Sequence, residues 1–149
     1  MNSSLEANFC KPEFPDLVQN GSTNRTSVAY RDTIGYLLEQ NHPSSTWTLC
    51  TGAQGDVGIR AIPAMTQGAL FSMATAACRE NEHTNVRFIE VYLAFRVEVD
   101  EDAIAHGVVK ASDFAAVYEG ILKNPEIRSS RVSVRGLQDM KDLKWARKF

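Results

Sequence analysis

Carboxylate, tyrosine and arginine side chains that could exchange protons gather in two stretches of the sequence. Asp56 lies in a glycine-rich segment, residues 52–62. Tyr92 and Arg96 share one side of a run in which polar and apolar residues alternate. A carboxylate can remove a proton from a carbonyl compound while an arginine or a tyrosine stabilises the oxyanion that forms. We therefore predict Asp56, Tyr92 and Arg96 as catalytic residues.

Further polar side chains near the same positions are candidates for contacts with a substrate. They are Cys50, Thr51, Arg60, Gln67, Glu90 and His106. Cys50 could be a nucleophile only beside a base, and the spacing of the histidines ties none of them to it, so an inert cysteine is the simpler interpretation. His106 is either a proton shuttle or an exposed loop residue. Glu90, Arg96 and Glu98 could instead form one solvated face with cross-strand ion pairs.

Composition excludes several classes of partner. The 149 residues carry a formal charge of −2, so the strong positive field of a nucleic-acid-binding protein is absent. No apolar run approaches the length of a membrane span, about 18 residues. The three cysteines, Cys10, Cys50 and Cys78, form neither a disulfide framework nor a metal-ligand pattern. No basic-then-apolar signal peptide opens the sequence, and we expect a small-molecule substrate, no metal, no membrane and a cytoplasmic location.

The elements that would position these residues form one α/β domain. We expect an N-terminal arm over 1–27, the domain over 28–136 and a basic, solvated tail over 137–149. Apolar periodicity predicts helices over 27–40, 64–81 and 112–123, and strands over 46–51, 86–99 and 131–134. This alternation predicts parallel strands joined by right-handed crossovers, and the 86–99 strand should have one apolar and one polar face.

Several segments resemble parts of one enzyme family. They are Thr46–Thr51, Ala64–Asn81, Asn85-Val86-Arg87-Phe88, Ala111-Ser112-Asp113-Phe114-Ala115 and Val132–Gly136. In this order they resemble the C-terminal half of a short-chain dehydrogenase/reductase, from about Phe14 to Gly136. The resemblance implies half of a Rossmann-like doubly wound sheet with flanking helices.

The same resemblance exposes departures from the family's chemistry. The half that carries the family's phosphate-binding loop is not matched, and residues 52–58 lack the GxGxxG spacing. Pro63 stands where the family has its catalytic tyrosine, and Gln67 stands at the lysine position. The serine position falls near Cys50 or Thr51. The resemblance therefore implies no nicotinamide cofactor and no hydride transfer by the family's mechanism.

Half of such a sheet would leave an open edge, which proteins usually cover. In the family, the helices that match 28–40 and 64–81 form a four-helix subunit interface. A stripe of small residues, Ala64, Gly68, Ser72 and Ala76, would let a second helix approach closely. We therefore expect dimerisation through these helices to complete the fold.

Three functions remain open from the sequence. The first is a cofactor-independent isomerase, cyclase or lyase that acts on a carbonyl compound, as in secondary metabolism. The second is a non-catalytic binding protein or partner subunit of a full-length dehydrogenase. The third is an inactive fragment. No set of residues selects a particular substrate.

Overall fold

Helices and strands alternate along the chain and pack as three layers. The structure is a computed structural model that describes residues 22–149, so most of the predicted arm lies outside the described residues. The larger elements are α2 (Ser22–Gln40), β1 (Thr46–Gly52), α4 (Ala61–Glu80), β2 (Arg87–Leu93), α6 (Ala111–Lys123) and β5 (Ser130–Val134). The smaller ones are α3 (Gln54–Val57), β3 (Val97–Glu98), α5 (Asp100–His106), β4 (Val109–Lys110), η2 (Leu137–Met140) and β6 (Lys144–Arg147).

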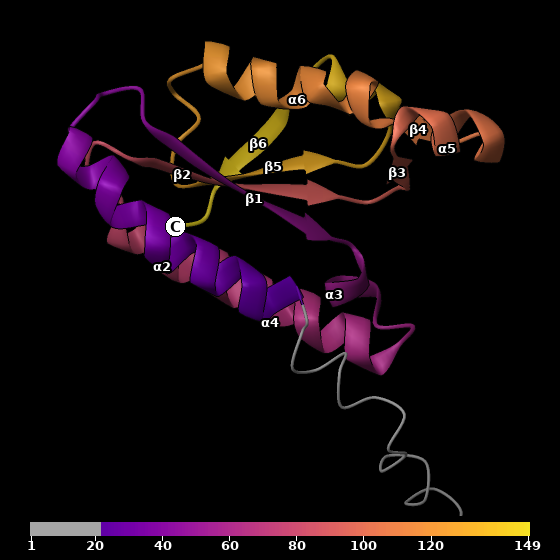
Figure 1. The fold of residues 1–149 in the computed structure, drawn as a ribbon, viewed down its shortest axis with the longest axis horizontal. Coiled ribbons are helices and arrows are strands. Elements are labelled where there is room, and N and C mark those ends of the chain that lie inside the picture. Colours follow the sequence, from indigo (N-terminus) through magenta and orange to yellow (C-terminus); the bar gives the residue numbers. More distant parts are fainter. Residues whose placement is uncertain (1–21) are drawn as a thin grey trace, which may run out of the picture.

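The main sheet has the strand order β1-β2-β5-β6. The first three strands are parallel, with Leu49 opposite Glu90 and Glu90 opposite Arg131. In Figure 1, α2 and α4 lie side by side on one face of the sheet, and α6 lies on the other. This confirms the predicted α/β fold with a mostly parallel sheet between helices.

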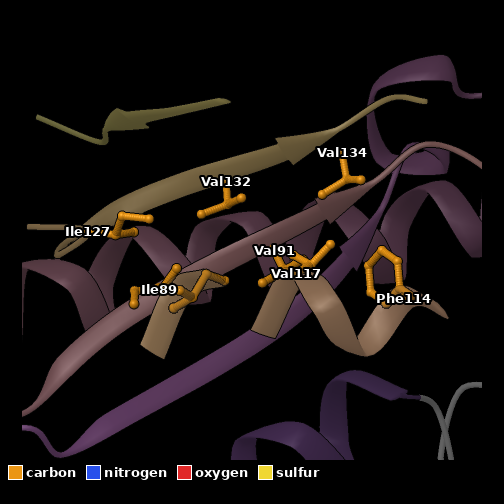
Figure 2. Close-up of a cluster of buried hydrophobic side chains, with 8 residues drawn as sticks. Ile89, Val91, Phe114, Val117, Ile127, Val132 and Val134 are labelled. Atoms are coloured by element: carbon orange, nitrogen blue, oxygen red, sulfur yellow. The ribbon is translucent and has the colours of Figure 1, made fainter. Parts of the chain in front are cut away.

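Period-two alternation in the strands builds a separate apolar core on each face. Toward α6, the inward residues of β2 and β5 meet one face of that helix (Figure 2). The buried members are Ile89, Val91, Phe114, Val117, Ile121, Ile127, Val132 and Val134. Toward α4, the buried cluster is Leu49, Leu70, Ala74, Ala77, Cys78 and Phe88. The small residues of α4 let the helix lie close to the sheet.

The prediction of one long strand over 86–99 is wrong. Strand β2 ends at Leu93, which is level with the last residues of both neighbours, Gly52 and Val134. Beyond that point no strand remains to accept further ladder bonds. The chain turns away, and Val97 and Glu98 pair with β4 in a separate two-stranded sheet.

The expected polar, solvated face of β2 is also absent. All residues of β2 except Leu93 are buried, and Glu90 is 0% exposed. Both faces of this central strand are covered, α4 lying over one and α6 over the other (Figure 1). Alternate residues of β2 therefore point toward α6 or toward α4, and neither set faces solvent.

The basic tail forms a strand that the sequence interpretation did not include. Strand β6 pairs antiparallel with β5, with Trp145 opposite Val132. The backbone groups along the free side of β5 supply the bonds that hold it there. Among the described residues, β1 pairs only with β2, so its other side is an open edge.

Candidate functional site

Asp56 and Tyr92, two of the three predicted catalytic residues, lie close to each other. The Asp56 carboxylate lies near the Tyr92 hydroxyl, and Asp56 belongs to the short helix α3 that follows β1. Tyr92 is 2% exposed, whereas Asp56 is exposed. Burial, followed by the neighbouring Asp56 carboxylate, raises the pKa of Tyr92. The pair therefore combines an accessible carboxylate with a phenol that keeps its proton.

Arg135 completes this group in place of Arg96. It follows β5 directly, and its guanidinium carbon lies 5.3 Å from the centre of the Tyr92 ring. Arg96 is turned toward Glu98, with which it forms an ion pair. The structure thus brings Asp56 and Tyr92 together and leaves Arg96 apart from them.

A cavity of about 800 Å³ opens at the carboxyl ends of β2 and β5. Its walls include Phe95, Val108, Met140, Arg96, Arg135 and Lys141. Ligands in open α/β sheets bind beyond the carboxyl ends of the strands, as this cavity does. Arg135 lines the cavity and also contacts Tyr92, so it links the cavity to the Asp56–Tyr92 pair.

His106 lies near the same cavity but points to Glu98. Its Nδ1 atom is 2.7 Å from Glu98 Oε2. The hydrogen bond with His106, and then the one with Arg96, lowers the pKa of the Glu98 carboxyl. His106 and Arg96 are therefore held together through one carboxylate between β3 and α5.

Glu90 and Thr51 form a second polar group on the α4 face of the sheet. Thr51 Oγ1 donates to Glu90 Oε1 at 2.8 Å. Arg131 Nε donates to Oε2 at 3.0 Å, and Lys148 Nζ donates to the same oxygen. This carboxylate is buried and forms ion pairs with two cations, and a buried carboxylate requires such pairing.

The remaining predicted contacts are spread around β1. Cys50 lies on the opposite face from Thr51, at the exposed edge and near the Tyr118 hydroxyl. The protein around its sulfur raises the pKa of Cys50, so the thiol stays neutral. Gln67 accepts a hydrogen bond from the Gly52 backbone N–H at 2.7 Å. Arg60 is exposed and immediately precedes α4.

The glycine-rich segment after β1 does not fit a nucleotide phosphate. A Cβ atom at Gly55 would lie 2.3 Å from Phe71 Cε2, so a side chain of this protein already fills that space. Gln67 carries no charge at the position of the family's lysine, and its amide oxygen is bonded to Gly52. This segment therefore provides neither an open phosphate cradle nor a charged side chain at the position of the family's lysine.

Sequence reasoning missed Arg131, Arg135 and Lys148. A signal for the first two exists, because Arg131, Ser133 and Arg135 alternate with the apolar Val132 and Val134. That pattern puts both arginines on the face that holds Glu90 and Tyr92. Lys148 carries no such signal, since it reaches Glu90 only because β6 folds back along β5.

Residues 22–149 were also searched for metal sites and for membrane-spanning helices. No three His, Cys, Asp or Glu side chains in this part of the chain are grouped so that they could hold a metal ion. None of its helices is long and apolar enough to cross a bilayer.

Comparison with known proteins identifies a relative of this sequence. Over 125 residues the chain is 54% identical to a curated protein named short-chain dehydrogenase/reductase iacG, from Pestalotiopsis fici. The match covers 80% of this chain and 50% of that protein, so the chain spans about half the length of the relative that it matches. No family model and no solved structure matches the chain. The match and the mostly parallel α/β sheet together confirm the resemblance of this chain to part of a short-chain dehydrogenase/reductase.

Proposed function

We propose that the chain catalyses proton transfer on a small carbonyl compound without a nicotinamide cofactor. The outcome would be an isomerisation, a cyclisation or an elimination, of the kind found in secondary metabolism. The observation that carries this proposal is the proximity of the Asp56 carboxylate to the Tyr92 phenol, beside Arg135 and the cavity that Arg135 lines.

Each of the three side chains has a distinct role in this reaction. The exposed carboxylate of Asp56 takes a proton from the carbon next to the carbonyl, and the electron pair of that C–H bond moves onto the carbonyl oxygen. Arg135 stabilises the enolate oxygen. Tyr92 keeps its proton because its pKa is raised, so it can donate to the enolate at another carbon or to a leaving group. The proton that Asp56 has taken then passes to the Tyr92 phenolate, which restores both groups.

The positions of the family's acid and base argue against hydride transfer by this chain. Pro63 has no proton to donate, and it lies in the first turn of α4. Gln67 cannot lower the pKa of a neighbouring phenol by charge, because its amide is neutral. The Asp56–Tyr92 pair therefore provides a proton-transfer group that does not depend on those two positions.

Isotope exchange tests this proposal before the substrate is known. The chain is incubated in D2O with a panel of ketones and β-dicarbonyl compounds, and NMR follows deuterium entry next to the carbonyl. Asp56→Asn should slow the exchange by about 100-fold or more, because it removes the base. Tyr92→Phe and Arg135→Ala should slow it less. Lys123→Gln, on the outer surface of α6, is the control with unchanged exchange. If all three site variants exchange as fast as the wild-type chain, the site is wrongly assigned.

A second candidate function is that of a partner subunit for a longer dehydrogenase. The open edge of β1 favours it, since Thr46–Gly52 pair on one side only among the described residues. Exposed apolar residues Val57, Ile59 and Met65 follow β1 in the chain. Size-exclusion chromatography with light scattering separates the two functions. A stable particle that carries out exchange alone supports the enzyme, and a chain that stays soluble only when co-expressed with a dehydrogenase supports the subunit.

We also propose that the active form is a homodimer in which α2 and α4 face their counterparts. The small residues of α4 favour this, because no atom of the described chain lies within 4 Å of a Cβ placed at Gly68. A helix of a second copy could therefore approach α4 closely at this position. The same light-scattering experiment measures the mass of the particle.

A further inference from the structure

A second cavity, of about 450 Å³, lies between α4 and the β5–β6 pair. Its lining includes Phe71, Ser72 and Thr75 from α4, and Arg131, Arg147 and Lys148 from the other side. This cavity is distinct from the one at the carboxyl ends of β2 and β5, with which it shares no lining residue. Three of its six named side chains are cationic.

Cationic side chains around this cavity outnumber the carboxylates with which they pair. Arg131 and Lys148 share a single carboxylate, that of Glu90, and the Lys148 side chain is only 9% exposed. Arg147 is neutralised separately, by an ion pair with Glu82 at 2.7 Å. Farther along the sheet, Arg135 and Asp56 both face Tyr92 and offset each other. Among the described residues, neither Arg131 nor Lys148 forms an ion pair with a second carboxylate.

Hydrogen-bond donors also remain unused at this point. Within residues 22–149, Arg131 bonds only through Nε, which leaves its two terminal nitrogens available. The guanidinium plane is held by two aromatic rings, since its central carbon lies 4.7 Å from the Phe71 ring centre and 5.1 Å from that of Tyr92. Ser72 is exposed on the facing side of the cavity. A fixed guanidinium with two free nitrogens favours an oxyanion.

We propose that this cavity binds the carboxylate or phosphate group of a small organic anion. The group would lie against the terminal nitrogens of Arg131, with Lys148 behind them and the Ser72 hydroxyl opposite. Binding would supply a second negative charge beside a partly buried pair of cations. The proposal goes beyond proton transfer at Asp56 and Tyr92, and its test measures binding alone.

Titration with inorganic phosphate and with acetate, each in a chloride-free buffer, tests the proposal. Calorimetry gives the affinity, and thermal unfolding gives the stabilisation. We expect saturable binding of at least one of the two anions, and the tighter one identifies which group the site prefers. Added salt should weaken binding. Arg131→Gln should weaken it by about tenfold or more, because the charged donors are lost.

Glu90→Gln gives the opposite result and so separates binding from folding. Without the carboxylate, Arg131 and Lys148 would carry two uncompensated charges, and phosphate or acetate should bind more tightly than to the wild-type chain. Lys123→Gln, which removes an exposed charge far from the cavity, should leave the affinity unchanged. The absence of saturable binding for both anions would overturn the proposal. So would an unchanged affinity in Arg131→Gln or a weaker one in Glu90→Gln.

Discussion

Gly55 is the position at which one added methyl group should separate Asp56 from Tyr92. A Cβ atom there would lie 2.3 Å from Phe71 Cε2 and 2.7 Å from Cζ, and also 3.1 Å from Gln67 Cβ. The Phe71 ring cannot simply rotate away, because it packs against Tyr92 at 6.0 Å and under the Arg131 guanidinium at 4.7 Å. Either the ring or helix α3 must move, and Asp56 moves with α3.

The expected cost follows from two opposing effects. Forcing an extra carbon into a packed region destabilises a protein by about 1–3 kcal/mol. Alanine in place of glycine within a helix stabilises it by about 1 kcal/mol. Gly35→Ala in α2 is the matched control, since no atom lies within 4 Å of its added Cβ. The difference between the two variants removes the helix effect, so Gly55→Ala should be less stable than Gly35→Ala by about 1–3 kcal/mol.

Urea unfolding at neutral pH measures both variants, and deuterium exchange on the carbonyl panel measures the site. For a chain of this size, the difference corresponds to a fall in Tm of roughly 2–4 °C per kcal/mol. Gly55→Ala should also lose exchange activity, whereas Gly35→Ala should keep it. Equal stability of the two variants would mean that Phe71 does not pack against Gly55 as described, and the position of Asp56 would lose its support.

Three further predictions concern other parts of the fold. His106 and Arg96 lower the pKa of the Glu98 carboxyl, so its ionised form stabilises the fold above the ordinary glutamate pKa, about 4.3. This stabilisation is lost as the pH falls through the lowered pKa. Glu98→Gln should therefore flatten the decline in the free energy of unfolding, measured with urea, between about pH 5 and 3. Arg87→Met should cost about 3 kcal/mol in the same assay, because the buried guanidinium donates to the carbonyls of Asn124 at 2.9 Å and Ile127 at 3.1 Å; a loss below 1 kcal/mol would contradict this role. Gly68→Leu should convert a homodimer to a monomer in light scattering with little change in the circular dichroism, and an unchanged mass would place the interface elsewhere.

The elements that the sequence predicted well have local signals at their ends. The helix before β1 ends ahead of Pro43, and α6 ends ahead of Pro125, because proline disfavours a helical residue before it. Strand β1 ends at Gly52, as expected. Within such boundaries, the spacing of apolar residues was sufficient to distinguish helices from strands.

The end of β2 could not be read in the same way. Phe95, Val97 and Val99 continue the alternation of the strand, so the sequence pattern runs on past Leu93. The strand stops because its neighbours β1 and β5 stop, and their register with β2 depends on contacts between distant parts of the chain. The burial of Glu90 has the same origin, since only the assembled layers cover both faces.

Some parts of the candidate site were likewise predictable from local sequence signals, and others depend on contacts between distant parts of the chain. Proximity of Asp56 and Tyr92 was predictable, because both lie near the carboxyl ends of neighbouring parallel strands. Arg96 was predicted beside them because the expected strand continued to residue 99, whereas β2 ends at Leu93. Lys148 was not foreseen because a short basic segment gives no sign of pairing with β5 until the free side of that strand is known.

One experiment tests most directly whether the chain performs proton transfer rather than hydride transfer. NADPH is added to the chain and the carbonyl panel in D2O, and NMR follows the cofactor, the carbonyl compounds and any alcohol in the same sample. We predict that deuterium enters next to a carbonyl group, that Asp56→Asn suppresses this entry, and that NADPH is not consumed. Consumption of NADPH with formation of an alcohol would contradict the proposed chemistry.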